Sequence, residues 1–281
     1  MSHIPGLSRR ESILSIQAKK ELGHKISMVT CYDAAFAQII DETPIDMVLV
    51  GDSVGNVMLG QASTLTVTLE DMIHHAKAVT RGIKRAFVVV DMPFMTYQVS
   101  VKKALTHAGK LVSKGGAQAV KMEGGASIVA QVKAVVDAGI PVMGHLGFTP
   151  QSLHALGGYK VQGLEPAAKE RLLADALLLQ EAGVFSIVLE MIPSELSAAI
   201  TSSLRIPTIG VGAGIGCDGQ VLVLHDLLGF KSKFKPRFVK RYADLNQIVS
   251  QALREYDNDV KCGVFPSSDH SFPGPDEATV H

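Results

Sequence analysis

Short apolar runs recur along the chain, and most are apolar at every position instead of alternating with polar residues. A run of this kind is typical of a parallel β-strand that is buried on both faces. Most runs end in a polar or Gly-rich turn. The eight runs cover residues 26–32, 47–50, 86–90, 117–122, 141–144, 185–189, 207–211 and 220–224.

The stretches between these runs are helix-like in most units. Thr68 followed by Asp71 has the spacing of a capping box, which predicts the start of one helix. An extra amphipathic helix is expected near the N-terminus, over residues 8–22. The other predicted helices cover residues 34–41, 69–81, 101–114, 127–138, 165–182 and 195–203.

Eight strand-and-helix units favour a (β/α)8 TIM barrel over an open doubly wound sheet. The length of 281 residues suits one barrel domain, which we expect over residues 1–256. Residues 257–281 are rich in Pro, Ser, Asp and Gly and are expected to form a loosely ordered C-terminal tail. The seventh run reaches the eighth through a Gly-rich turn alone, so this unit departs from the pattern.

Composition and charge narrow the class of protein. Lys and Arg number 27, as do Asp and Glu, so no net field favours nucleic acid or an anionic membrane. Residues 1–24 lack the apolar core of a secretory signal, and no run approaches the ~20 apolar residues of a membrane span. The three cysteines have no CxxC spacing, so we expect a cytoplasmic protein.

The C-terminal ends of barrel strands converge on one rim, where barrel enzymes carry their active sites. Asp33 and Asp226 can be explained there as helix caps alone. The remaining carboxylates would repel one another, so a cation should lie among them, either Lys121 or a metal ion. The polar residues expected at this rim are Asp33, Asp52, Ser53, Asp91, Lys121, Glu123, His145, Glu190, His225 and Asp226.

Carboxylate oxygens favour Mg²⁺ or Mn²⁺, and no His-x-x-x-His or Cys-rich spacing points to zinc or copper. Mg²⁺ commonly takes few protein carboxylates and leaves positions for water and substrate. A 2-oxo acid can fill two of these positions, where the metal acts as a Lewis acid on the ketone. The rim therefore predicts a metal-dependent enzyme that acts on a small 2-oxo acid.

A Gly-rich stretch, from Gly214 to Gly219, matches the GxGxxG pattern of dinucleotide-binding loops. Residues 220–224 follow it with the pattern of a strand, whereas a dinucleotide-binding loop opens a helix. We therefore expect no dinucleotide site at this turn.

Several longer motifs occur in colinear order from about Thr30 to Gly229. They are Val50-Gly-Asp-Ser-Val-Gly55, Asp91-Met-Pro-Phe94, Val120-Lys-Met-Glu-Gly-Gly125, Gly144-His-Leu-Gly-Phe-Thr-Pro-Gln151, Gly157-Gly-Tyr-Lys-Val-Gln-Gly163, Leu189-Glu190, Gly212-Ala-Gly214 and Asp218-Gly-Gln-Val-Leu-Val-Leu-His-Asp226. Together they resemble the ketopantoate hydroxymethyltransferase family.

The resemblance implies transfer of a one-carbon unit from 5,10-methylenetetrahydrofolate to 3-methyl-2-oxobutanoate. The product is 2-dehydropantoate, an intermediate on the route to pantothenate and coenzyme A. It also implies one Mg²⁺ per subunit and a homo-oligomer, decameric in the family. By motif, the implied Mg²⁺ ligands are Asp52, Asp91 and Glu123, the implied 2-oxo acid contacts are Asp52, Ser53, Asp91 and Lys121, and the implied general base is Glu190.

Three alternatives remain open at this stage. A Mg²⁺-dependent barrel lyase acting next to a 2-oxo acid would use the same carboxylates. A Schiff-base aldolase would use Lys121, although Glu123 close by would keep that amine charged. A non-enzymatic barrel used for binding or assembly is the third, and the clustered carboxylates argue against it.

Overall fold

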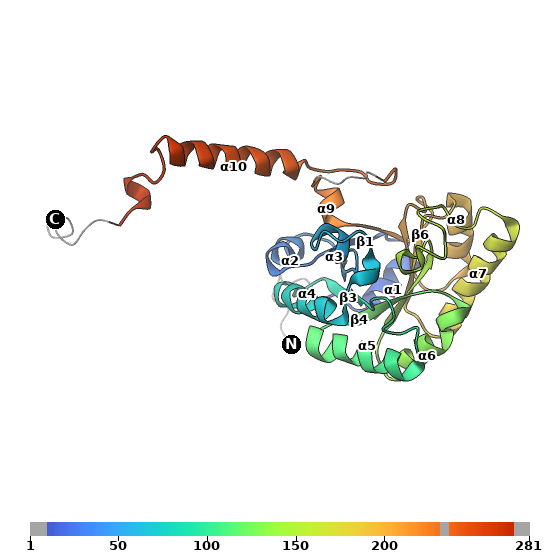
Figure 1. Cartoon of the computed structure of the whole chain (residues 1–281). Coiled ribbons are helices and arrows are strands. Elements are labelled where there is room, and N and C mark those ends of the chain that lie inside the picture. Colours follow the sequence, from blue (N-terminus) through green and yellow to red (C-terminus); the bar gives the residue numbers. More distant parts are fainter. Residues whose placement is uncertain (1–9, 231–235, 273–281) are drawn as a thin grey trace. The chain divides into compact units, whose positions relative to one another are not determined.

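The computed structural model describes residues 10–230 and 236–272. The chain divides into two compact units, Met1–Leu224 and His225–His281. Eight parallel strands in the first unit close into a barrel in sequence order, with β8 pairing to β1 (Figure 1). The predicted (β/α)8 TIM barrel is confirmed. Its strands are β1 (Ile26–Thr30), β2 (Met47–Val50), β3 (Phe87–Asp91), β4 (Ala119–Glu123), β5 (Val142–Gly147), β6 (Ser186–Glu190), β7 (Thr208–Val211) and β8 (Gly219–Leu222).

Helices surround these strands (Figure 1). The predicted capping box starts α4, because Asp71 N–H donates to Thr68 Oγ1 at 3.1 Å and Thr68 N–H donates to Asp71 Oδ2 at 2.9 Å. As predicted, β7 leads into β8 without an intervening helix. None of the described helices combines the length and apolar composition needed to cross a membrane. The helices of this unit are α1 (Ile13–Glu21), α2 (Ala34–Asp41), α3 (Val54–Val57), α4 (Leu69–Gly82), α5 (Val101–Gly115), α6 (Val129–Asp137), α7 (Pro166–Glu181) and α8 (Ser194–Ser203).

The barrel interior changes character along its axis. Its apolar core includes Phe87, Val89 and Met143, all of which are buried. Successive residues of a strand point to opposite faces, so the next inward position after Val89 is Asp91, and after Met143 it is His145. The same alternation turns the interior from apolar to charged at the C-terminal ends of the strands.

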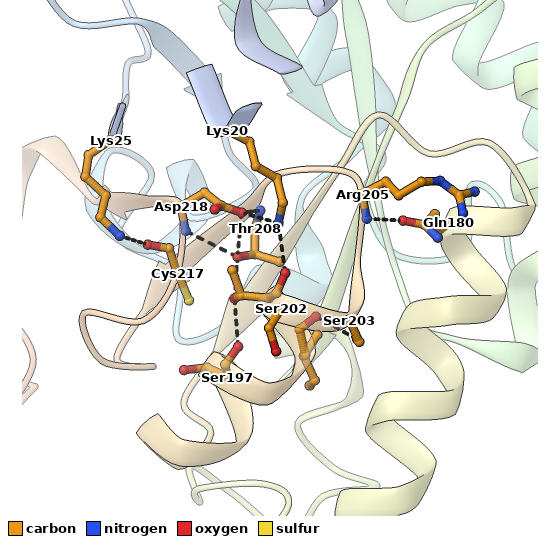
Figure 2. Close-up of polar contacts among 12 residues, drawn as sticks. Lys20, Lys25, Gln180, Ser197, Ser202, Ser203, Arg205, Thr208, Cys217 and Asp218 are labelled. Atoms are coloured by element: carbon orange, nitrogen blue, oxygen red, sulfur yellow. Dashed lines mark hydrogen bonds and ion pairs between the residues drawn. The ribbon is translucent and has the colours of Figure 1, made fainter. Parts of the chain in front are cut away.

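Helix α1 closes the opposite, N-terminal end of the barrel. Its Ile16 is fully buried in the apolar core. Lys19 Nζ lies 3.0 Å from Asp46 Oδ1, just before β2. Lys20 Nζ donates to Asp218 Oδ2 at 2.9 Å, just before β8 (Figure 2). The predicted N-terminal helix is therefore an end cap that contacts two strand starts.

Beyond the barrel the chain forms α9 (Leu224–Leu227), α10 (Leu245–Lys261) and the short 3-10 helix η4 (Ser268–His270). The pattern of apolar runs does not predict α10. This helix crosses residue 256, and the domain boundary expected there stays a prediction. The expected tail begins as the last turn of α10, and no described residue in it is buried. Residues 273–281 lie outside the described residues.

We predict that Asp218→Ala destabilises the barrel. Its Oδ2 accepts from Lys20 Nζ at 2.9 Å and from Thr208 N–H at 2.8 Å (Figure 2). Losing a charged acceptor for one buried main-chain donor and one partly buried ammonium group should cost about 2 kcal/mol, a fall of about 4–8 °C in Tm. The matched control is Asp137→Ala, because the exposed Asp137–Lys133 ion pair contributes little. Equal Tm values for the two variants in thermal unfolding would contradict the prediction.

Candidate active site

The charged side chains at the C-terminal end of the barrel are almost fully buried. Asp91 and Glu123 are the last residues of β3 and β4, and Asp52 follows β2 by two residues. Burying carboxylates without partners is costly, so their contacts decide what the site can do. The exposed fractions are 4 % for Asp52, 3 % for Asp91, 5 % for Lys121, 6 % for Glu123 and 1 % for His145.

The structure brings the three predicted metal ligands together. The main-chain N–H of Asp52 donates to Asp91 Oδ2 at 3.0 Å. Lys121 Nζ lies 3.2 Å from Asp91 Oδ1 and 4.0 Å from Glu123 Oε1. Asp91 and Lys121 are register partners on adjacent strands, which places these opposite charges side by side. One ammonium group therefore pairs with two of the three carboxylates.

His145, on β5, connects this cluster with Glu190, the last residue of β6. Its Nδ1 atom lies 3.1 Å from Lys121 Nζ and 3.2 Å from Glu123 Oε1. Its Nε2 atom lies 3.2 Å from Glu190 Oε2. The Glu190 side chain is 18 % exposed, more than the side chains of its neighbours in the cluster. The predicted base thus borders the buried cluster and remains accessible to solvent.

The electrostatics of the site show an excess of negative charge. Burial raises the pKa of Asp52 well above its usual range, and repulsion by Asp91 and Glu123 raises it further. Burial lowers the pKa of Lys121, but the neighbouring carboxylates outweigh this effect and keep it above its ordinary value. The lysine is firmly protonated, yet its charge is insufficient to balance Asp52.

The residues fit a hard divalent cation. Asp91 Oδ1 and Glu123 Oε1 are buried, and each faces a cationic side chain: Lys121 Nζ lies 3.2 Å from the first and His145 Nδ1 lies 3.2 Å from the second. Clustered carboxylate oxygens are the donors that Mg²⁺ takes, and the charge of Asp52 is the one that Lys121 leaves unbalanced. Within residues 10–230 and 236–272, no group of three or more His, Cys, Asp or Glu side chains already has the geometry to hold a metal ion.

Two further side chains, Gln151 and Tyr97, contact the predicted ligands, and the sequence pattern predicts a role for neither. Gln151 Nε2 donates to Asp52 Oδ2 at 2.9 Å, and Gln151 N–H donates to Glu123 Oε2 at 3.0 Å. The Tyr97 hydroxyl accepts the main-chain N–H of Glu123 at 3.0 Å. The feature of the sequence that could indicate a site role for Gln151 is its position at the end of the motif that begins at Gly144.

Ser53, a predicted substrate contact, lies at the start of α3. Its Oγ atom is 2.9 Å from the hydroxyl of Tyr32, which is buried. The main-chain oxygen of Tyr32 lies 2.7 Å from His75 Nδ1. Asp33 caps α2 by accepting Phe36 N–H at 2.9 Å, so a capping role accounts for it.

The Gly-rich turn from Gly214 to Gly219 leads into the strand β8. The strand predicted after this turn is therefore confirmed, whereas a dinucleotide-binding loop opens a helix.

A closed parallel barrel with clustered carboxylates, an imidazole and an ammonium group at its C-terminal rim is typical of a (β/α)8-barrel enzyme. The family model for ketopantoate hydroxymethyltransferase matches residues 10–268. The 3-methyl-2-oxobutanoate hydroxymethyltransferase of Syntrophotalea carbinolica is 54% identical over 266 residues, covering 95% of this chain and 100% of the relative. The protein of that name from Geobacter sulfurreducens is 53% identical with the same coverage. The chain belongs to the ketopantoate hydroxymethyltransferase family.

Solved structures with little sequence identity share the fold. A phosphonopyruvate hydrolase, solved as a complex with oxalate and Mg²⁺, aligns with a TM-score of 0.61 at 11% identity, covering 95% of this chain and 93% of that one. A 2,3-dimethylmalate lyase aligns with a TM-score of 0.57 at 17% identity, covering 95% of both chains. At this identity the likeness shows the barrel fold alone.

We predict a pH-dependent stability that depends on His145. Burial and Lys121 lower the pKa of this imidazole, but Glu123 and Glu190 raise it by more, to about 9. The protonated ring therefore stabilises the metal-free protein fully below the unfolded pKa of about 6.5, and this stabilisation is lost as the pH rises through about 9. His145→Gln should flatten the fall of Tm across this window. A fall of the same size in the variant would contradict the prediction.

Proposed function

We propose that this chain catalyses the Mg²⁺-dependent transfer of a hydroxymethyl group from 5,10-methylenetetrahydrofolate to 3-methyl-2-oxobutanoate. The product is 2-dehydropantoate, in pantothenate biosynthesis. The observation that carries the proposal is the buried cluster of Asp52, Asp91 and Glu123 beside Lys121, in a chain whose relatives bear the name of this activity.

Asp52, Asp91 and Glu123 would hold one Mg²⁺ per subunit. The burial of these three carboxylates close together supports this assignment, as does the pKa of Asp52, which burial and repulsion by Asp91 and Glu123 raise. When bound, Mg²⁺ supplies Lewis-acid polarisation of the substrate's ketone.

Asp52, Ser53, Asp91 and Lys121 form the proposed contacts to the 2-oxo acid. Lys121 binds the anionic substrate through charge-assisted hydrogen bonds, because its amine is buried and protonated. Ser53 can offer a hydroxyl, whose position is set by Tyr32 at 2.9 Å. Burial excludes water around these groups, which strengthens each interaction with the substrate.

Glu190 is the proposed general base, which removes the proton from C3 of the substrate. It stands on β6, away from the strands that carry the proposed ligands, so it can approach the carbon from a separate direction. His145 lies 3.2 Å from Glu190 Oε2 and orients this carboxylate. Water cleaves the two C–N bonds of the donor's methylene group, which releases tetrahydrofolate and a formaldehyde unit. The carbon nucleophile formed by proton removal adds to this unit, whose oxygen takes up a proton and becomes the new hydroxyl group.

We also propose a cytoplasmic homo-oligomer, decameric as in the resembling family. The exposed apolar side chains of α10, including Ile248 and Leu253, support association with another chain.

The balanced charge supports small molecules rather than nucleic acid as partners. We retain residues 1–256 as one domain, followed by the tail 257–281.

We predict that Lys121 makes no covalent intermediate. A Schiff base needs a neutral amine, whereas the carboxylates around Lys121 raise its pKa. Lys121→Arg should retain part of the activity, because the charge survives although the geometry changes. Borohydride with substrate should leave the protein mass unchanged. A stable adduct located on Lys121 by mass spectrometry would replace this mechanism by that of a Schiff-base aldolase.

The experiment that tests the proposed function is hydrogen exchange at C3. With Mg²⁺ and no folate, the enzyme should exchange the C3 hydrogen of 3-methyl-2-oxobutanoate with solvent deuterium. Glu190→Gln keeps the size of the side chain but cannot accept the proton. It should lose exchange by roughly 10²–10⁴-fold while binding substrate nearly normally. The C3 proton signal, followed by NMR over time, gives the rate.

Two further variants make the exchange experiment specific. Glu195→Gln is the matched control, because this exposed glutamate lies in the first turn of α8 and should leave exchange unchanged. Asp91→Asn should lose both metal binding and exchange. Undiminished exchange in Glu190→Gln would remove Glu190 from the mechanism and point to His145 instead.

A further inference from the structure

Gln151 reaches all three strand ends that carry the proposed Mg²⁺ ligands. It lies just after β5, in the short 3-10 helix η3 (Pro150–Ser152), and is 5 % exposed. Its side-chain Nε2 donates to Asp52 Oδ2, after β2, and to the carbonyl oxygen of Met92, after β3, each at 2.9 Å. Its main-chain N–H donates to Glu123 Oε2, at the end of β4, at 3.0 Å.

The contacts fix which way the Gln151 amide faces. Both partners of Nε2 are acceptors, and both partners of Oε1 can donate. The Tyr97 hydroxyl lies 2.9 Å from Oε1, and Gln98 Nε2 donates to the same atom at 3.0 Å. A flipped amide would place its oxygen against the Asp52 carboxylate and the Met92 carbonyl, with no proton between them. The amide therefore faces Asp52 and Met92 with its nitrogen, while Gln98 donates to its oxygen and the Tyr97 hydroxyl divides its single proton between that oxygen and the Glu123 carbonyl oxygen at 3.1 Å.

Each of the three carboxylates has one oxygen that accepts a hydrogen bond from the protein. Asp52 Oδ2 and Glu123 Oε2 accept from Gln151, and Asp91 Oδ2 accepts from Asp52 N–H. The second oxygens of Asp91 and Glu123 face Lys121 Nζ and His145 Nδ1, each at 3.2 Å. Hydrogen bonds to one oxygen fix the plane of a carboxylate and so direct its other oxygen.

We propose that Gln151 is the positioning residue of the metal site. It fixes Asp52 and Glu123 relative to each other, and it fixes the chain that follows Asp91, before the ion arrives. The Tyr97 hydroxyl helps to hold Gln151 in place, because it contacts Gln151 Oε1 and also accepts Glu123 N–H at 3.0 Å. The inference rests on the proposed function only in taking these carboxylates as metal ligands.

The test is the affinity of the metal-free protein for Mn²⁺, a stand-in for Mg²⁺ whose free form gives an EPR signal. Gln151→Met keeps the length of the side chain and the main-chain N–H but removes both side-chain donors. It should weaken Mn²⁺ binding by about 10–100-fold, the usual effect of losing a partner that orients metal ligands. The Tm of the metal-free variant, measured in parallel, reports whether the protein is folded.

Two glutamine-to-methionine controls separate positioning from a general effect of the substitution. Gln118 is half-buried before β4 and accepts Val88 N–H at 3.0 Å, at the other end of the barrel. Gln118→Met should leave Mn²⁺ affinity unchanged. Gln98→Met removes a partner of the Gln151 oxygen but neither carboxylate contact, so its effect should be far smaller than that of Gln151→Met.

A second variant carries the test if Gln151→Met does not fold. Tyr97→Phe keeps the ring and removes the hydroxyl, so it loosens both Gln151 and Glu123, and it should weaken Mn²⁺ binding about fivefold. The proposal is overturned if every folded variant of this pair binds Mn²⁺ within twofold of the wild type. Asp52→Asn, which changes a proposed ligand, is measured beside these variants. If it abolishes Mn²⁺ binding while the Gln151 and Tyr97 variants do not weaken it, the proposed function stands and only the positioning role is lost. Wild-type protein that binds no Mn²⁺ would instead remove the metal site and this inference with it.

Discussion

The burial of three carboxylates beside one another is the constraint on which the rest of this site depends. Removing an ionised carboxylate from water costs several kcal/mol unless opposite charge and hydrogen bonds replace the lost solvation. Lys121, on a neighbouring strand, supplies one positive charge, and main-chain and amide N–H groups supply donors. Burial and repulsion by Asp91 and Glu123 still raise the pKa of Asp52 well above its usual range, and this excess of negative charge supports the proposed binding of a cation.

The buried carboxylates lie at one end of the barrel, and contacts of helix α1 stabilise the other end. Helix α1 places Ile16 in the core and ties Lys19 and Lys20 to the carboxylates of Asp46 and Asp218. These ion pairs lie before the strands, whereas the unbalanced carboxylates lie after them. The contacts that stabilise the barrel thus lie at the N-terminal ends of the strands, and the side chains of the candidate active site lie at the C-terminal ends. This division is usual in barrel enzymes.

The sequence predicts most of the barrel because strand and helix follow from local patterns. Continuous apolar runs give all eight strands, and the rule that strand ends converge on one rim brings Asp52, Asp91, Glu123 and Glu190 together. The contact between Gln151 and Asp52 is not predictable in this way, because the two residues are 99 positions apart and no local sequence pattern indicates that they meet. The strand-and-helix pattern does not predict α10, because no ninth strand precedes this helix.

The order of the strands explains how one site can hold both a metal ion and a base. The proposed ligands end β2, β3 and β4, His145 lies on β5, and Glu190 ends β6, so the chemistry occupies one continuous arc of the barrel. A base placed among the ligands would have its carboxylate drawn to the ion. With His145 between them, Glu190 remains 3.2 Å from a ring nitrogen and partly open to solvent, where it can take up a proton and later release it. The single strand β5 therefore separates the proposed general base, Glu190, from the proposed metal ligands on β2, β3 and β4.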